Sequence, residues 1–263
     1  MLLSRWRYYL GSVPLLLAGS RRPIRTGARL LAPGRRAPVL WELREGPAFA
    51  VRSALDVWVV KETWLDRFYD RHGVPVEDGW SVLDVGAGLG DYTLLAAARS
   101  PRGRVVAFEP DPASFALLEA NVARAGAGNV TLHRAALGAP GQTLRLEEGA
   151  RAPVRARTVE APAAGPGPSV PTLSLEEALD GAGLAACDLV KLDCEGAEVG
   201  ILLGASTATL RRVRHFVLET HDLGAGPGPR ELAERLAADG FEVRRTSNPA
   251  WSVLGWLHAR RLD

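Results

Sequence analysis

Several features that would define a protein class on their own are scarce in this chain. Only two of its 263 residues are cysteines, Cys187 and Cys194, so neither a disulfide framework nor a zinc site with four cysteine ligands can form. We therefore expect a reduced, cytoplasmic setting. A membrane-spanning helix needs roughly 20 apolar residues, but the apolar run at 10–18 is interrupted by glycine, serine and proline. The same interruptions argue against a secretory signal.

Acidic residues are missing from the first 41 positions, which carry eight arginines. The eight are Arg5, Arg7, Arg21, Arg22, Arg25, Arg29, Arg35 and Arg36. The rest of the chain holds 24 basic residues (32 − 8) against 30 acidic ones, a net charge of −6. Basic arms are attracted to anionic lipid, nucleic acid or acidic protein surfaces. Peripheral membrane contact through this arm is one expectation, and an arm without an anionic partner is the alternative.

The chain divides into three segments. Residues 1–38 form a basic extension, residues 39–80 form a lead-in, and residues 81–263 form the main domain. In the lead-in, short strands are expected over 39–60 around a turn at Gly46 and Pro47. A helix is expected over 61–72, where it forms a lid with Glu62 and Tyr69 as contacts.

Apolar strands and amphipathic helices alternate in the main domain, which predicts a parallel sheet with helices on both faces. Strands are predicted over 81–85, 104–109, 130–135, 188–193 and 213–220, and helices over 91–99, 112–125, 174–180, 197–210 and 230–239. The last two strands, 241–245 and 252–260, are antiparallel because their link is short. Residues 141–171 are irregular, with a hairpin at 143–147 and 154–160 and a loop at 161–168. The fold class is therefore α/β and Rossmann-like.

A glycine-rich turn joins the first strand of this domain to its helix. The segment reads VLDVGAGLGDYT, with Asp84 two residues before the first glycine. Dinucleotide-binding folds usually carry G-x-G-x-x-G and place a pyrophosphate on the helix end. The spacing here is G-x-G-x-G, and an acid beneath the turn would repel a diphosphate. It suits a cationic ligand such as S-adenosylmethionine, while Glu109, ending the second strand, is placed to accept the ribose hydroxyls.

Ligands of such sheets bind outside the carboxyl ends of the strands. The predicted cofactor-binding residues are Asp84, Gly86, Ala87, Gly88, Gly90, Asp91, Tyr92, Glu109, Pro110, Ala135 and Ala136. Ala135 and Ala136 are small enough to admit an adenine. Two assignments have structural alternatives, because Asp91 can cap the helix and Tyr92 can pack in the core.

A second acidic cluster follows the fourth strand and meets the end of the fifth. The segments read DLVKLDCEGAE and LETHD, and they supply Asp193, Glu195 and His221 as candidate catalytic residues. In one chemistry, His221 or Asp193 acts as a general base toward an acceptor hydroxyl. In the other, Asp193, Glu195 and His221 bind Mg²⁺ or another divalent cation that acidifies the hydroxyl. Glu198 is expected to cap the next helix instead.

These segments resemble the FkbM-type methyltransferases. VLDVGAGLGDYT, FEPDP, HRAALG, KLDCEGAE and LETH occur in the same order, within a resemblance that covers about residues 40–246. The resemblance implies a class I S-adenosylmethionine-dependent methyltransferase fold and O-methylation of a hydroxyl on a sugar, glycan or secondary metabolite. It implies cofactor contacts for Asp84, Gly86, Gly88 and Glu109, and catalytic or acceptor-side roles for Asp193, Glu195 and His221.

Two other functions stay open at this point. One is an N- or RNA-directed methyltransferase that uses the basic arm. The Asn/Asp-Pro-Pro-aromatic tetrad that amine methylation favours does not follow the strand at 188–193, which argues against it. The other is a non-catalytic, membrane-associated scaffold that kept the fold.

Overall fold

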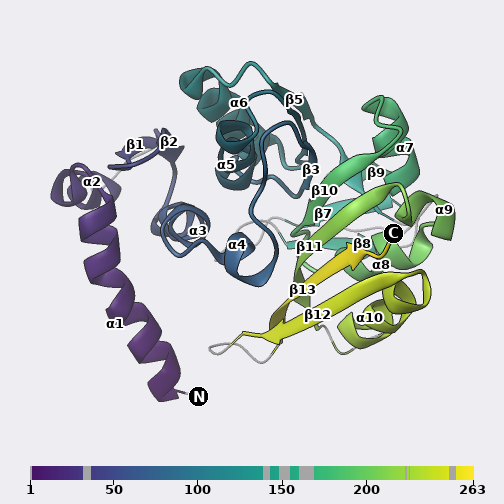
Figure 1. Ribbon diagram of the computed structural model, residues 1–263. Coiled ribbons are helices and arrows are strands. Elements are labelled where there is room, and N and C mark those ends of the chain that lie inside the picture. The colour runs from purple at the N-terminus through teal and green to yellow at the C-terminus, as the bar shows by residue number, and fades with distance from the viewer. Residues whose placement is uncertain are drawn as a thin grey trace.

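The computed structural model describes residues 2–31, 37–138, 143–147, 155–159, 169–222, 224, 226–248 and 253–263. Within them, a twisted sheet has the strand order β12-β13-β11-β10-β3-β4-β5 (Figure 1). Its strands are β3 (Ser81–Val85), β4 (Arg104–Phe108), β5 (Val130–His133), β10 (Cys187–Leu192), β11 (Val213–His221), β12 (Phe241–Ser247) and β13 (Leu254–Arg261). β13 is antiparallel to both neighbours, and the other pairs are parallel. The predicted α/β fold, with its antiparallel C-terminal hairpin, is confirmed.

The strand order reverses between β3 and β10, since β3 leads outward to β4 while β10 leads the other way to β11. Such a switch point opens a crevice at the carboxyl ends of the two strands. Both segments that carry chemistry, after β3 and after β10, therefore meet at this crevice. The register pairs Val85 with Leu192 at the end of the two strands.

Helices cover both faces of the sheet. They are α5 (Asp91–Arg99), α6 (Pro112–Ala125), α7 (Leu175–Gly181), α8 (Glu198–Gly204), α9 (Thr207–Leu210) and α10 (Pro229–Ala238). On one face Phe216 and Leu218 pack with Leu232 and Leu236 of α10, and on the other Val82 and Leu189 pack with helix α5. The predicted single helix over 197–210 is two helices, because the chain becomes extended at Ala205.

The lead-in differs from its predicted boundaries. A hairpin of β1 (Val39–Glu42) and β2 (Ala48–Val51) turns at Gly46 and Pro47 as expected. The following residues form α3 (Ala54–Trp64) and α4 (Phe68–His72). The predicted extension of strand structure as far as residue 60, and the predicted single helix over 61–72, were therefore wrong. Ser53 caps α3 by accepting the N–H of Asp56 at 3.3 Å. This cap overrides the strand preference of the apolar run after Asp56, and left-handed Arg67 separates the two helices.

The N-terminal extension folds as α1 (Leu2–Gly19) and α2 (Pro23–Leu30). It is docked at its carboxyl half, since Lys61 donates to the Ser12 hydroxyl at 2.7 Å and the Trp41 indole donates to Ser20 at 2.8 Å. Figure 1 shows α1 and α2 at the periphery, with α3 between them and the sheet. None of the described helices is long and apolar enough to cross a membrane.

A smaller sheet lies beside the site. Its order is β6-β9-β7-β8, with β6 (Ala136–Leu137), β7 (Thr143–Glu147), β8 (Arg155–Val159) and β9 (Ser169–Leu173). β7 and β8 are the predicted hairpin, which is confirmed. β9 was not predicted, and the predicted loop at 161–168 lies outside the described residues. Ala136 and Leu137 of β6 line the pocket described below, so this sheet borders it.

Candidate active site

A pocket opens at the carboxyl ends of β3, β4 and β10, and α3 borders it from the lead-in. Its lining includes six carboxylates and two cations. The carboxylates are Asp56, Asp91, Glu109, Asp111, Asp193 and Glu195, and the cations are Arg52 and Lys191. This excess of negative charge favours a cationic ligand and opposes a diphosphate.

The glycine turn shapes the floor of this pocket. The N–H groups of Gly86 and Ala87 both donate to the Phe108 carbonyl at 3.0 Å, which ties the turn to the end of β4. Gly86 has a φ of +75°, and a Cβ there would lie 1.9 Å from the Asp193 carbonyl oxygen. Gly88 has a φ of +55°, but a Cβ there would meet no described atom within 4 Å. Gly86 therefore serves close packing against the β10 loop, whereas Gly88 leaves room on the pocket side.

Alanine at these two positions should separate folding from binding. We expect Gly86→Ala to lower the free energy of unfolding by more than about 3 kcal/mol, because left-handed strain adds to a backbone clash. Gly88→Ala should cost only about 1–2 kcal/mol, the left-handed penalty alone, and still weaken cofactor binding. Thermal denaturation and titration calorimetry with S-adenosylhomocysteine distinguish the two effects. Equal melting temperatures for the two variants would contradict this account of Gly86.

Asp84 does not line the pocket as the sequence suggested. Its side chain is fully buried, 3.0 Å from the Lys191 ammonium, and it accepts a hydrogen bond from Thr93 at 2.6 Å. Lys191 also donates to the Gly86 carbonyl at 2.8 Å. Burial opposes the charged ammonium, yet the carboxylates of Asp84, Asp193 and Asp91 raise the pKa of Lys191 above its usual value. Asp84 therefore supports the turn from below, and its charge is neutralised by Lys191.

Three further predicted cofactor residues are buried beneath the pocket. Ala87 and Tyr92 are each 2% exposed, and Gly90 is the left-handed cap that begins α5. Tyr92 packs edge-on against Tyr69, so its structural alternative applies. The pocket is lined by Gly86, Gly88, Asp91, Glu109, Pro110, Ala135 and Ala136, whose contacts with a cofactor stay a prediction.

Glu109 lies at the end of β4 with its carboxylate held in place by the backbone. Its two oxygens accept the N–H groups of Gly88 and Asp111, each at 2.8 Å. Burial, partly offset by these two hydrogen bonds, raises its pKa to about 7. Each carboxylate oxygen can accept a second hydrogen bond, so both remain able to receive ribose hydroxyls.

The opposite end of the pocket is acidic and buried. Asp91 accepts a hydrogen bond from Thr63 of α3, and burial, partly offset by Lys191, raises its pKa to about 7. The hydroxyl of Tyr69, on α4, donates to Asp193 at 2.9 Å. Burial and the charge of Asp193 raise the pKa of Tyr69, which keeps this donor protonated. Tyr69 thus contacts the site as the lid hypothesis expected, whereas Glu62 accepts from Trp58 and does not line the pocket.

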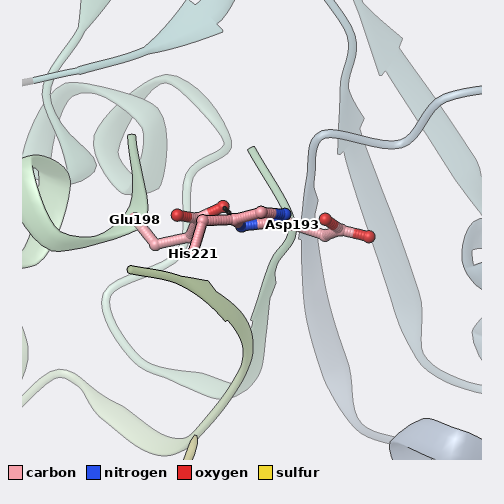
Figure 2. Close-up of side chains that lie close together, drawn as sticks. All are labelled: Asp193, Glu198 and His221. Carbon is pink, nitrogen blue, oxygen red and sulfur yellow. Dashed lines mark ion pairs between the residues drawn. The ribbon is translucent and has the colours of Figure 1, made fainter. Parts of the chain in front are cut away.

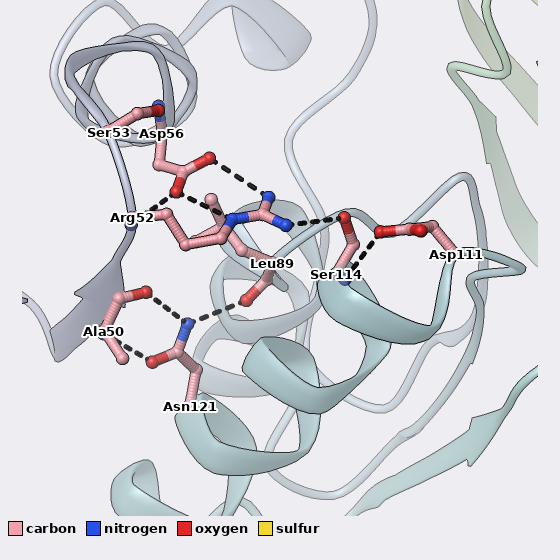
Figure 3. Close-up of polar contacts among 8 residues, drawn as sticks. All are labelled: Ala50, Arg52, Ser53, Asp56, Leu89, Asp111, Ser114 and Asn121. Carbon is pink, nitrogen blue, oxygen red and sulfur yellow. Dashed lines mark hydrogen bonds and ion pairs between the residues drawn. The ribbon is translucent and has the colours of Figure 1, made fainter. Parts of the chain in front are cut away.

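Arg52 links the lead-in to the ribose side of the pocket (Figure 3). Its guanidinium donates to both carboxylate oxygens of Asp56 at 3.2 Å and to the Ser114 hydroxyl at 3.3 Å. The Asn121 side chain forms a second link, accepting from the Ala50 N–H at 2.6 Å and donating to the Leu89 carbonyl at 2.9 Å. The Arg52 contacts hold the start of α3 against α6, the Asn121 contacts hold β2 there, and no local sequence pattern indicates either link.

The ends of β10 and β11 bring three side chains together (Figure 2). His221 lies between the carboxylates of Glu198 and Asp193, and one ligand atom from each side chain lies within 4.8 Å of the others. The buried Nδ1 of His221 is 3.2 Å from Glu198, while Nε2 is 3.7 Å from Glu195. Burial alone would lower the pKa of His221, but Glu198, Asp193 and Glu195 raise it to about 10.

Glu198 is the member of this cluster that sequence reasoning assigned only to capping. It is fully buried and does accept N–H groups of the preceding loop, from Cys194 at 2.5 Å and Gly196 at 3.0 Å. It also pairs with His221, whereas the predicted Glu195 has a 47% exposed side chain. The sequence signal that could have placed Glu198 in the cluster is its position at the start of α8, directly after the loop that carries Asp193. The prediction treated capping and a place in the cluster as alternatives, but the Glu198 carboxylate does both.

The topology, the glycine turn and the ribose-side carboxylate together define a class I S-adenosylmethionine-dependent methyltransferase. The methyltransferase FkbM domain family matches residues 84–243. The chain is 30% identical over 223 residues to the 31-O-demethyl-FK506 methyltransferase FkbM of Streptomyces tacrolimicus, covering 74% of this chain and 85% of that protein. It is 26% identical over 204 residues to the hexuronic acid methyltransferase AglP of Haloferax volcanii, covering 77% and 81%.

A solved structure of a methyltransferase FkbM from Methylobacillus flagellatus KT has the same fold. It is 16% identical, with a TM-score of 0.50, over 77% of this chain and 53% of that one. The chain belongs to the FkbM methyltransferase family. Its cofactor is S-adenosylmethionine, which agrees with the negative lining of the pocket.

Proposed function

We propose that the protein methylates a hydroxyl oxygen of a small-molecule or glycan acceptor. The pairing of His221 with buried Glu198 beside Asp193 carries this proposal. A carboxylate 3.2 Å from Nδ1 favours a proton on that nitrogen, so that Nε2 can act as a base once the ring is neutral. The Streptomyces relative's name specifies an oxygen acceptor, which supports the same reaction here.

The reaction requires one bond to form as another breaks. S-Adenosylmethionine would be held by the glycine turn and Glu109, and it would supply an electrophilic methyl group to the acceptor oxygen with S-adenosylhomocysteine as the leaving group. His221 Nε2 takes the hydroxyl proton, and Glu198 stabilises the resulting imidazolium. Asp193, held by Tyr69, orients the acceptor hydroxyl, so that much of the rate comes from positioning.

The pKa of His221 predicts a rate that rises with pH. Because the surrounding carboxylates raise this pKa to about 10, the imidazole becomes a neutral base only as the pH increases. Replacing Glu198 with Gln removes its strongest supporting charge and should lower the pKa. We expect the rising limb of kcat/KM to move to lower pH in Glu198→Gln.

Two measurements test this shift, and one does not need an acceptor. An NMR titration of the His221 ring should give a pKa well above 6.5 in the wild type and a lower one in Glu198→Gln. The pH profile of turnover should move in the same direction. Glu119→Gln, an exposed change on α6, is the matched control and should move neither. An unchanged His221 pKa in Glu198→Gln would argue against the pairing.

A divalent cation at the same cluster is the second candidate. The proximity of Asp193, Glu198 and His221 favours it, since carboxylate and imidazole are common metal ligands. Glu198 is already paired with Nδ1 of His221 at 3.2 Å, which favours the base instead. We expect turnover to survive incubation with EDTA. Loss of turnover that Mg²⁺ or Mn²⁺ restores would favour the cation.

The RNA-directed alternative is disfavoured by the charge of the pocket. A polyanion would have to approach six lining carboxylates that face only two cations. Filter binding of RNA over a salt series tests it, because phosphate contacts give a steep dependence on salt. A non-catalytic scaffold would instead bind S-adenosylmethionine without transferring methyl groups to any acceptor.

A further inference from the structure

The short helix α2 presents described apolar residues to solvent. It packs on β1, and among its described side chains polar Thr26 is buried, at 7% exposed. Ile24 and Ala28 of α2 are spaced i, i+4 and share one face of the helix, and Leu31 follows directly after its last residue. Ile24 and Leu31 are each 84% exposed, so this apolar face points away from the protein.

Helix α1 carries a second exposed apolar stripe. Its docked side includes Ser12 and Leu16, which face α3 and the core around β1. Leu10, Val13 and Leu17 lie on a different side at i, i+3 and i+7 spacing and are 64%, 50% and 50% exposed. Exposed apolar residues gathered on neighbouring elements mark an interaction surface.

The charge around these apolar residues specifies the kind of partner. Arg21, Arg22 and Arg25 are exposed on and beside α2, and no described acidic side chain forms an ion pair with them. No acidic residue occurs in the first 41 positions of the sequence. Arginines that flank an exposed apolar face are the arrangement of helices that lie in an anionic membrane interface.

We propose that α1 and α2 form a peripheral docking surface for an anionic phospholipid bilayer. Ile24, Leu31 and the α1 stripe would enter the headgroup–acyl boundary, and the arginines would meet lipid phosphates. A bilayer explains both features together, whereas nucleic acid would use the arginines and leave the apolar face exposed. The surface lies apart from the cofactor pocket, so binding here is independent of the proposed function.

Co-sedimentation of the full chain with vesicles tests this surface. Vesicles of phosphatidylcholine alone are compared with vesicles that also contain phosphatidylglycerol. We expect binding to require phosphatidylglycerol and to weaken as salt is raised. The double variant Ile24→Glu with Leu31→Glu should bind at least about tenfold more weakly, because it removes the inserted apolar area. The variant Arg22→Glu with Arg25→Glu should lose the preference for phosphatidylglycerol.

Matched variants control for nonspecific effects. Leu262→Glu changes an apolar residue that is 48% exposed outside α1 and α2, and Arg124→Glu with Arg245→Glu reverses two exposed charges elsewhere. These controls should bind vesicles like the wild type, and all variants should keep the wild-type melting temperature and S-adenosylhomocysteine affinity. Wild-type protein that stays in the supernatant with both vesicle types would overturn the proposal. Vesicle binding that Ile24→Glu with Leu31→Glu leaves unchanged would also overturn it. So would binding to soluble RNA that is as tight as the binding to phosphatidylglycerol vesicles.

Discussion

Replacing His221 with alanine is expected to lower methyl transfer by about 10²- to 10⁴-fold, the usual contribution of a general base. Cofactor affinity should change little, because His221 is paired with Glu198 beyond the residues that line the cofactor pocket. Turnover is measured as S-adenosylhomocysteine released with an accepted hydroxyl compound, and affinity is measured by calorimetry. The predicted effect is therefore on kcat and leaves cofactor binding intact.

Two controls make this result specific. His258→Ala removes a half-buried histidine on β13 that pairs with His215 instead of the carboxylate cluster, and it should retain turnover. Added imidazole should partly restore His221→Ala, because it can supply the missing base. A variant that loses cofactor affinity and turnover together would show that His221 supports the fold and not the chemistry.

Replacing Glu109 with alanine should weaken S-adenosylhomocysteine binding by about 10²- to 10⁴-fold. A hydrogen bond to a charged group contributes about 1.5–3 kcal/mol, Glu109 can accept two from the ribose, and about 1.4 kcal/mol corresponds to tenfold. The loss includes a loosened turn, since Glu109 also accepts the Gly88 N–H.

Calorimetry measures this loss, and thermal denaturation checks that the fold persists. Glu119→Ala, an exposed change on the neighbouring α6, is the matched control and should bind normally. Wild-type affinity in Glu109→Ala would mean that the ribose lies elsewhere, and the orientation of the cofactor in the pocket would need revision.

The sequence predicts the frame of this site well because local patterns determine it. The glycines at 86 and 88 indicate a left-handed turn. The apolar strands that end at Asp84 and Glu109 indicate the crevice at their carboxyl ends. The pairing of Asp84 with Lys191 could not be read in this way, since the two residues are 107 positions apart in the sequence. It follows from the adjacency of β3 and β10, which places Lys191 opposite Asp84 in the register.

Two other features depended on whether local preference or tertiary contacts prevail, which a single sequence does not show. The apolar run 57–60 has strand-like composition, but the Ser53 cap and packing against α5 make it helical. Glu198 looked like an ordinary helix-terminal acid because nothing local indicates that β11 delivers His221 beside it. In both cases tertiary contacts decided the outcome over local preference.

Transfer of a ¹³C-labelled methyl group tests the central claim most directly. Wild-type protein is incubated with methyl-labelled S-adenosylmethionine and panels of hydroxyl-bearing and amine-bearing acceptors, and NMR identifies the atom that receives the label. The account predicts label on oxygen in the wild type and almost none in His221→Ala. Label on nitrogen, or oxygen labelling that His221→Ala leaves undiminished, would contradict it.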